Sequence, residues 1–170
     1  MPKKLQECKL KIAATKESYK DEYYEIFLED NNYHKFAYSD PLPREKFDER
    51  HENSSHDPCF VLVNESDKVI GFCEISISSF DGWGELNFMV RKKFQNQGYG
   101  KLMLELVIEQ IKKLGNIDYL EAETFSNINS EKLLESIGFI KAGFFPNYRK
   151  IFKDGEYIKL DSTSYYYKLR

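Results

Sequence analysis

The sequence predicts an α/β fold in which about four helices flank a mixed, mostly antiparallel sheet of about six to seven strands. Two observations predict it. Strand-like segments follow one another through short turns in the middle and at the end of the chain, and segments with helical periodicity interrupt them. Because hairpins give antiparallel neighbours and helical crossovers give parallel ones, this order favours a mixed sheet covered by helices. The 170 residues suit a single domain over residues 1–170.

The first part of the chain contains one predicted strand and two predicted helices. Apolar and polar residues alternate over residues 8–14, which indicates a strand. Aromatic and aliphatic residues then recur at helical spacing over residues 16–33. The segment Asp40-Pro41-Leu42-Pro43 breaks this pattern, and Pro43 suits the first position of a second helix over residues 43–52.

Turn residues and changes of periodicity delimit the remaining elements. Residues 99–114 carry a broad apolar stripe of helical spacing, and Gly115 is suited to end that helix. Asp154-Gly155 is typical of a hairpin turn in the tail. In chain order we expect strands at residues 60–63, 69–78 and 83–90, the helix at 99–114, a strand at 119–125, a short helix at 130–137 and a β-rich tail at 139–170.

Composition and charge exclude several classes of protein. The formal net charge of −3 argues against a general nucleic-acid-binding protein, which needs a basic surface. No apolar run reaches membrane-spanning length, and the N-terminal residues lack the apolar core of a signal peptide. The three cysteines and the histidines show no metal-ligand spacing. We therefore expect a cytoplasmic protein with no metal, no nucleic-acid partner and no membrane partner.

The segment over residues 90–101 runs from a predicted strand, through a polar loop that contains glycine, into the start of a predicted helix. Backbone N–H groups at a helix N-terminus lack intrahelical partners and the helix dipole is positive there, so phosphate groups bind well. Gly98 and Gly100 have no Cβ, which allows a pyrophosphate to approach the backbone closely. Lys101 adds a positive charge beside them.

Other phosphate-binding loops fit this segment less well. A Walker loop needs Ser or Thr after Gly-Lys, but Leu102 follows Lys101 and the upstream glycine is absent. A dinucleotide fingerprint needs three spaced glycines near the first strand of a βαβ unit. A helix-capping turn with two glycines stays open as the structural alternative, because so short a match is weak by itself.

A longer match makes the loop specific. Residues 95–100, Gln-Asn-Gln-Gly-Tyr-Gly, resemble the Gln/Arg-x-x-Gly-x-Gly/Ala signature of the GNAT acetyltransferase superfamily. Residues 127–139 resemble the second motif of that family, which is an asparagine, a small residue three positions later and a closing Gly-Phe. The tail is similar to the branch that contains the ribosomal-protein N-terminal acetyltransferases. The resemblance covers nearly the whole chain and implies the acyl-CoA acyltransferase fold of this family.

The resemblance also implies a set of cofactor-binding residues. In the family, the loop amides bind the pyrophosphate of acetyl-CoA, and the pantetheine arm enters between two splayed strands. A backbone amide at the end of the first of these strands is a candidate to polarise the thioester carbonyl. The implied residues are Met89, Val90, Gln95, Gln97, Gly98, Gly100, Lys101 and Asn127. For Met89 a place in the core, and for Asn127 a place as a helix-capping residue, are the alternatives.

The chemistry requires a base, because an alkylamine is mostly protonated near neutral pH. Glu85 is the first candidate, since many family members carry Glu on this strand, and Glu121 and Glu123 on the neighbouring strand are rivals. Much of the family protonates the departing thiolate with a tyrosine seven residues after the motif asparagine, but Leu134 occupies that position here. Ser130, where the ribosomal-protein branch often has serine, is the candidate acid.

The function implied by the resemblance is transfer of an acetyl group from acetyl-CoA to a primary amine, by direct attack on the thioester in a ternary complex. The amine belongs to a protein N-terminus, a polyamine or another small molecule. A non-catalytic acyl-CoA-binding regulator or sensor is the alternative. A homodimer formed through the β-rich tail is also implied. The acidic stretch over residues 21–30 is either a solvated helix face or a part of the acceptor cleft.

Overall fold

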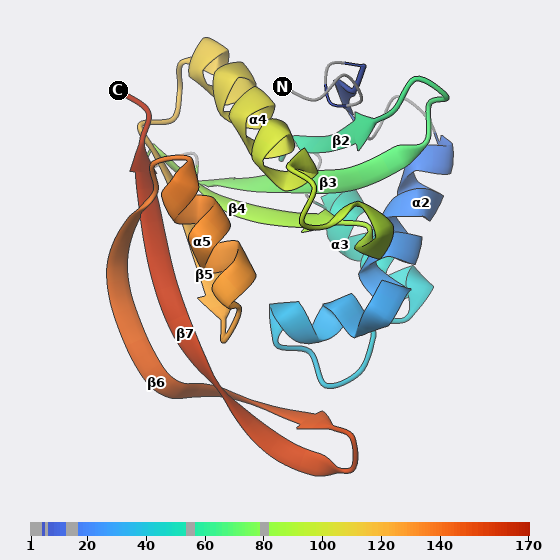
Figure 1. The fold of residues 1–170 in the computed structure, drawn as a ribbon, viewed down its shortest axis with the longest axis vertical. Helices are drawn as coiled ribbons and strands as arrows, with labels where there is room; N and C mark the ends of the chain where they lie inside the picture. Colours follow the sequence, from blue (N-terminus) through green and yellow to red (C-terminus); the bar gives the residue numbers. More distant parts are fainter. Residues whose placement is uncertain (1–4, 6, 13–16, 54–56, 79–81) are drawn as a thin grey trace.

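The computed structural model describes residue 5 and residues 7–12, 17–53, 57–78 and 82–170. Within these residues, seven strands form one sheet in the order β1-β2-β3-β4-β5-β7-β6 (Figure 1). The pair β4–β5 is parallel and every other neighbouring pair is antiparallel. The strands are β1 (Lys9–Ile12), β2 (Cys59–Val63), β3 (Val69–Ser78), β4 (Trp83–Val90), β5 (Tyr119–Phe125), β6 (Ile140–Lys153) and β7 (Glu156–Lys168).

Helices cover both faces of this sheet. On one face α4 buries Met103, Val107 and Ile111 in a core that includes residues of β2 to β5 and of α5. On the other face α2 buries Tyr19 and Ile26 against β2, β3 and α3. The helical segments are α2 (Glu17–Leu28), the 3-10 helix η2 (Glu29–Phe36), α3 (Arg44–Asn53), the 3-10 helix η3 (Lys92–Phe94), α4 (Tyr99–Leu114) and α5 (Ile128–Ser136). The mixed sheet covered by helices confirms the predicted fold class.

One helix prediction was wrong over its last five residues. The helix expected over residues 16–33 is regular only to Leu28, because Asp30 and Asn31 both adopt left-handed backbone conformations with φ of 53°. These two residues lie near the start of η2 and form a kink after α2, and Ala37 with φ of 58° ends η2. Residues 13–16, which include the start of the expected helix and the end of the expected first strand, lie outside the described residues.

The parallel strands β4 and β5 are paired only where they begin. Residues 83–85 of β4 lie in register with residues 119–121 of β5. Among the described residues, the rest of β4 has no partner in β5, although β3 accompanies β4 along its full length and β7 accompanies β5 along its full length. The two strands therefore diverge and leave two strand edges that face each other across an opening.

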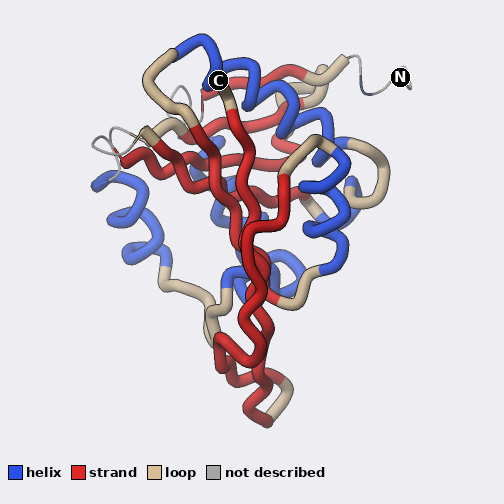
Figure 2. Tube along the Cα trace, turned by 90° about the vertical axis from the view of Figure 1, so that its left-hand side faces the viewer, coloured by secondary structure: helices blue, strands red, loops and turns tan. Residues whose placement is uncertain are grey.

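The hairpin of β6 and β7 extends well beyond the rest of the sheet as an arm (Figures 1 and 2). Its register shifts between Phe145 and Arg149, so that residues 146–148 bulge out of β6 opposite Asp161. Asn147 has φ of 53° there and donates its backbone N–H to the Asp161 carboxylate at 2.8 Å. Such bulges bend a strand and change the direction in which its side chains point.

Candidate active site

The hydrogen bonds of β4 determine which of its backbone groups face the opening. The N–H of Arg91 donates to the carbonyl of Ile70 in the β3 register at 2.8 Å. Because antiparallel pairs alternate in this respect, the backbone groups of Met89 also point toward β3, whereas those of Phe88 and Val90 point away from it. The sequence implied Met89 and Val90 as the strand-end positions. Of these two, only Val90 directs its backbone groups into the opening, and Phe88 does so as well.

The same argument applies to the facing strand. The N–H of Ser126 donates to the carbonyl of Asp161 at 2.9 Å, which continues the β5–β7 register. By alternation, the backbone groups of Glu123 and Phe125 point away from β7 and into the opening. Both edges of the opening thus offer backbone donors and acceptors, and buried groups of this kind require a partner.

A cavity of about 220 Å³ lies at the open end of these strands. Most of the predicted cofactor residues line it, which brings together the end of β4, the loop and the start of α5. They are Met89, Val90, Gln95, Gly98, Gly100, Lys101 and Asn127. Gln97 does not line it, and its side chain instead donates to the backbone carbonyl of Lys93 at 2.7 Å.

The glutamine of the loop motif closes the loop onto the strand. The side-chain amide of Gln95 donates to the carbonyl of Val90 at 2.8 Å, and its backbone N–H donates to the carbonyl of Lys92 at 3.2 Å. Gln95 therefore shapes the loop with the same groups that would otherwise contact a phosphate. The N–H of Val90 stays directed toward the opening.

Glycine is required at the two loop positions for different reasons, backbone conformation at Gly98 and lack of space for a side chain at Gly100. Gly98 precedes α4 with φ of 89°, a conformation that side chains rarely adopt, and it is exposed. At Gly100 a Cβ would lie 3.0 Å from the side chain of Leu133. Gly98 thus keeps the helix N-terminus open, while Gly100 allows α4 to approach α5.

Lys35 and Asn32, which the sequence analysis did not identify, complete the cavity from η2. Asn32 is fully buried and donates to the carbonyl of Ile26 at 2.8 Å, while its side-chain oxygen accepts a hydrogen bond from Lys35 Nζ at 2.6 Å. Partial burial lowers the pKa of Lys35 below its ordinary value. The left-handed residues Asp30 and Asn31 near the start of η2 redirect the chain just before Asn32 and Lys35, and no sequence pattern indicates such a turn.

Ion pairs connect α2 and η2 to Arg91 and Lys92, at the start of the glycine-containing loop. Neither interpretation of the acidic residues 21–30 in the sequence included this role. Arg91 donates to the carboxylates of Glu22 at 3.3 Å and Glu25 at 3.0 Å. Lys92 pairs with Asp30 at 2.5 Å. The side chain of Arg91 is only 15% exposed, so its pair with Glu22 is screened less than a surface pair. These acidic residues therefore hold η2 beside the glycine-containing loop that precedes α4.

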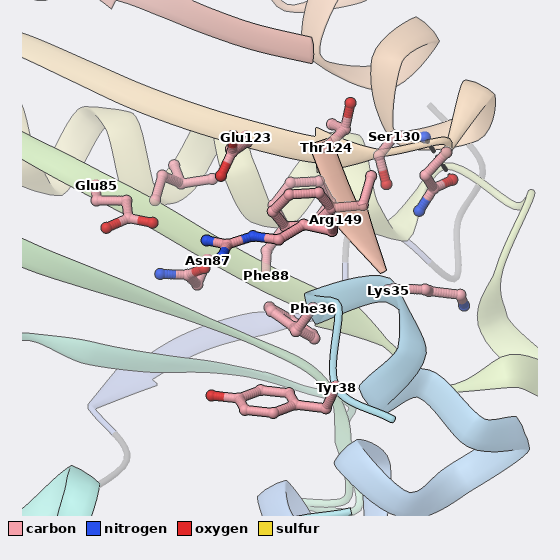
Figure 3. A pocket seen from close by; sticks show the side chains of 13 residues that line it. Lys35, Phe36, Tyr38, Glu85, Asn87, Phe88, Glu123, Thr124, Ser130 and Arg149 are labelled. Atoms are coloured by element: carbon pink, nitrogen blue, oxygen red, sulfur yellow. Dashed lines mark hydrogen bonds between the residues drawn. The ribbon is translucent and has the colours of Figure 1, made fainter. Parts of the chain in front are cut away.

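A second cavity, of about 240 Å³, opens between the diverging strands, the segment after η2 and the arm (Figure 3). Its lining is mostly polar and aromatic. It includes Lys35, Phe36, Tyr38, Glu85, Asn87, Phe88, Glu123, Thr124, Ser130 and Arg149. The hydroxyl of Thr124 is buried and has no hydrogen-bond partner in the described part of the chain.

The three candidate bases occupy different positions. Glu85 and Glu123 line the second cavity, from β4 and β5 respectively, and Figure 3 shows both side chains at its upper edge. Glu121 lies opposite Glu85 in the sheet register but does not line either cavity. The carboxylate of Glu123 accepts a hydrogen bond from the hydroxyl of Ser162. Geometry thus retains Glu85 and Glu123 as candidates and places Glu121 apart.

Asn127 and Ser130, the motif residues predicted for the pantetheine arm and the sulfur, lie at the start of α5. The side-chain oxygen of Asn127 accepts a hydrogen bond from the N–H of Ser130 and caps the helix. Leu134 is fully buried in the core. The two cavities share Lys35, Phe88, Asn127 and Ser130, so they meet at the start of α5.

The described residues contain no group of three or more His, Cys, Asp or Glu side chains arranged to hold a metal ion. No helix in the described residues is long and apolar enough to cross a membrane. Burial raises the pKa values of the Cys59 and Cys73 thiols above their ordinary range, so neither is a reactive thiolate near neutral pH.

Diverging strands, a glycine-containing loop at a helix N-terminus and two adjoining cavities come together in one region of the fold. The family model described as "Acetyltransferase (GNAT) family" matches residues 14–139, which is most of the chain. The chain therefore belongs to the GNAT family of acetyltransferases, and it is an acetyl-CoA-dependent N-acetyltransferase. A comparison with curated protein sequences found no match.

Solved structures share this fold over nearly their whole length. Spermidine N-acetyltransferase from Vibrio cholerae, in complex with CoA and spermine, is 15% identical with a TM-score of 0.81, covering 96% of each chain. An N-acetyltransferase from Staphylococcus aureus is 23% identical with a TM-score of 0.79, covering 96% of this chain and 99% of that one. The ribosomal-protein-S5-alanine acetyltransferase from Vibrio fischeri is 20% identical with a TM-score of 0.74, covering 95% and 93%.

Proposed function

We propose that the protein transfers the acetyl group of acetyl-CoA to the primary amine of a small molecule, by direct attack of the amine on the thioester in a ternary complex. One observation supports this proposal above the others. The cavity beside the loop and the cavity beside Glu85 meet at Phe88, Asn127 and Ser130. A donor in the first and an acceptor in the second would have their reacting ends together, which removes much of the entropic cost of reaction.

The residues of the first cavity fit acetyl-CoA. The backbone groups of Phe88 and Val90 face those of β5 across an opening that an extended, amide-containing chain can enter as a strand does. Gly98 leaves the N-terminus of α4 open to a pyrophosphate, and Lys35 and Lys101 supply positive charge on two sides. Acetyl-CoA, when bound, supplies the activated acetyl carbonyl.

The residues of the second cavity and those that line both cavities then have distinct roles. Glu85 accepts a proton from the acceptor ammonium, directly or through water, and the resulting amine forms the new C–N bond as the C–S bond breaks. The N–H of Val90 or Phe88 stabilises the developing oxyanion. Ser130 donates a hydrogen bond or a proton to the departing sulfur. The net reaction of a protonated amine releases one proton to solvent.

The size of the acceptor cavity favours a small substrate. Its volume is about 240 Å³. A small amine fits it completely, whereas a protein N-terminus would insert only its first residue or two. We therefore place small amines ahead of protein N-termini, and we place the enzyme in the cytoplasm, in keeping with acetyl-CoA as its donor.

A panel of amines tests this function. The protein is incubated with acetyl-CoA and one amine at a time, drawn from amino acids, polyamines, aromatic amines and short peptides, and the free thiol of CoA is measured. We expect acetylation of at least one small amine, together with a calorimetric signal and a thermal shift on binding acetyl-CoA alone. Binding of acetyl-CoA without acetylation of any amine would instead support the acyl-CoA sensor.

We further propose that the enzyme forms a homodimer through the arm. Aromatic side chains that are about half exposed or more gather on β6 and β7, among them Phe144, Phe145, Tyr148, Phe152 and Tyr157. Exposed apolar surface of this kind typically marks a protein contact. Sedimentation equilibrium measures the assembly, and Phe144→Ser with Phe152→Ser should shift it to the monomer.

A further inference from the structure

The acceptor cavity contains a permanent positive charge that the transfer reaction itself does not use. Arg149, from the arm, extends its guanidinium into the cavity toward Asn87, with Glu85 and Glu123 nearby (Figure 3). The guanidinium makes cation–π contacts with two aromatic rings, because its central carbon lies 5.0 Å from the centroid of the Tyr148 ring and 5.9 Å from that of the Phe125 ring. Among the described residues it has no hydrogen-bond or ion-pair partner within normal distance.

The fold directs Arg149 to this place. Arg149 is the first residue of β6 to regain the register after the bulge over residues 146–148. The bulge is held by the bond from Asn147 to Asp161, and Asp161 donates its own N–H to the hydroxyl of Ser126 at 2.9 Å. Ser126 immediately precedes Asn127, so the arm is fixed to the start of α5. The position of the guanidinium is thus tied to the point where the two cavities meet.

A guanidinium at this position disfavours an acceptor that carries only positive charge. Arg149 repels positive charge, so an ammonium group is favoured on the side of Glu85 and Glu123, and a second ammonium group beside Arg149 is disfavoured. The same guanidinium offers several N–H donors in a planar fork that matches a carboxylate. The free donors of Arg149 and the carboxylates of Glu85 and Glu123 together present both signs of charge to one small molecule.

We propose that the acceptor is an amine that also carries a carboxylate, of the amino-acid class, and that Arg149 binds this carboxylate. The inference rests on the proposed acetyl transfer and names its substrate class. The ammonium group of such an acceptor lies toward Glu85, where it loses its proton, and its carboxylate pairs with Arg149. Arg149 is therefore a specificity-determining residue, and it does not line the cavity assigned to the acetyl donor.

Matched acceptors test this assignment. Each amino acid of a small panel is compared with its amide and with the amine that lacks the carboxyl group, and kcat/KM is measured from the release of CoA. We expect at least one amino acid to exceed its own amide by about 10-fold or more, as a charge-assisted bidentate pair predicts. The amide has the less basic amine and is the more reactive nucleophile at neutral pH, so this preference cannot come from amine basicity.

Variants separate carboxylate binding from general charge effects. Arg149→Gln should lower kcat/KM for the preferred amino acid by about 10- to 100-fold and leave its amide and the KM for acetyl-CoA nearly unchanged. Arg149→Lys, which keeps the charge without the fork, should recover part of the loss. Lys150→Gln is the matched control, because Lys150 is the next residue on the strand but lies over the Tyr157 ring, outside the cavity.

Two results would overturn the assignment while leaving the proposed function intact. One is efficient acetylation of amines in which no amino acid exceeds its amide. The other is an Arg149→Gln variant that changes amino acid and amide by the same factor, which would make Arg149 a neutralising partner of the two glutamates. If acetyl-CoA binds and no amine of any class is acetylated, both the function and this inference are wrong.

Discussion

The side-chain oxygen of Asn127 lies 3.3 Å from the backbone nitrogen of Ser130 and caps α5, so the two motif residues at the junction of the cavities are joined directly. The cap of α5 is therefore Asn127, and the hydroxyl of Ser130 is not needed for that purpose. This arrangement separates the roles of the two residues and makes each testable.

Asn127→Ala should lower the free energy of unfolding by about 1 kcal/mol, because the cap is lost. It should also weaken binding of acetyl-CoA, since Asn127 lines the donor cavity. Thermal denaturation and calorimetry on the same protein measure both. Asn127→Asp keeps a capping oxygen but not the amide donor, so it should restore stability and not affinity. Unaltered affinity in both variants would limit Asn127 to the cap.

Ser130→Ala should lower the rate of acetyl transfer by about 10-fold or more while leaving the melting temperature and the affinity for acetyl-CoA nearly unchanged. A hydrogen bond to a charged group that forms only in the transition state appears in kcat. Single-turnover kinetics measure the chemical step. A normal rate would assign protonation of the thiolate to solvent.

Gly98→Asp should abolish tight binding of acetyl-CoA, because it places a negative charge at the open N-terminus of α4. It should also cost about 1–2 kcal/mol of stability for the left-handed backbone. Gly115→Asp is the matched control, since Gly115 has φ of 73° at the other end of the same helix. The control should lose similar stability and keep its affinity. An equal loss of affinity in both would mean that the phosphates bind elsewhere.

Glu85→Gln should lower turnover by roughly 10²–10⁴-fold near neutral pH, the usual effect of losing a positioned base. The loss should shrink as the pH rises, because more of the acceptor amine is then already neutral. Glu121→Gln is the control, since Glu121 lies opposite Glu85 outside both cavities. Full activity of Glu85→Gln with a strong loss in Glu123→Gln would transfer the role of base to Glu123.

Lys35→Gln should raise the KM for acetyl-CoA, and its effect on the melting temperature should depend on pH, because Lys35 is charged and also donates a hydrogen bond to the buried Asn32 side chain. Burial lowers the pKa of Lys35 in the folded state, so the native protein holds this proton less tightly than the unfolded chain does. The protonated side chain therefore costs stability at all pH values below its folded pKa, and this cost disappears as the pH rises above it. The melting temperature of Lys35→Gln, relative to that of the unsubstituted protein, should accordingly be higher at pH 7 than in alkaline buffer. A difference that is the same at both pH values would contradict this account.

The sequence predicted the fold and the donor cavity better than the acceptor cavity, for a physical reason. Strand alternation, the apolar stripe of α4 and the loop motif are local patterns, and they pointed to Val90, Gly98 and Asn127, which line one cavity in the structure. Lys35 and Arg149 reach the site only through a left-handed break and a strand bulge. Both devices depend on partners far away in the sequence, which periodicity does not reveal.

The sheet order also determines when the acceptor side can form during synthesis. β7 is made after β6, yet it lies between β5 and β6, so one edge of β5 has no partner until residues 156–168 have left the ribosome. Arg149 cannot reach its place before then, because the bulge is held by Asp161 of β7. The acceptor side of the site therefore forms no earlier than the pairing of β7 with β5 and β6, the last strand pairing that synthesis makes possible.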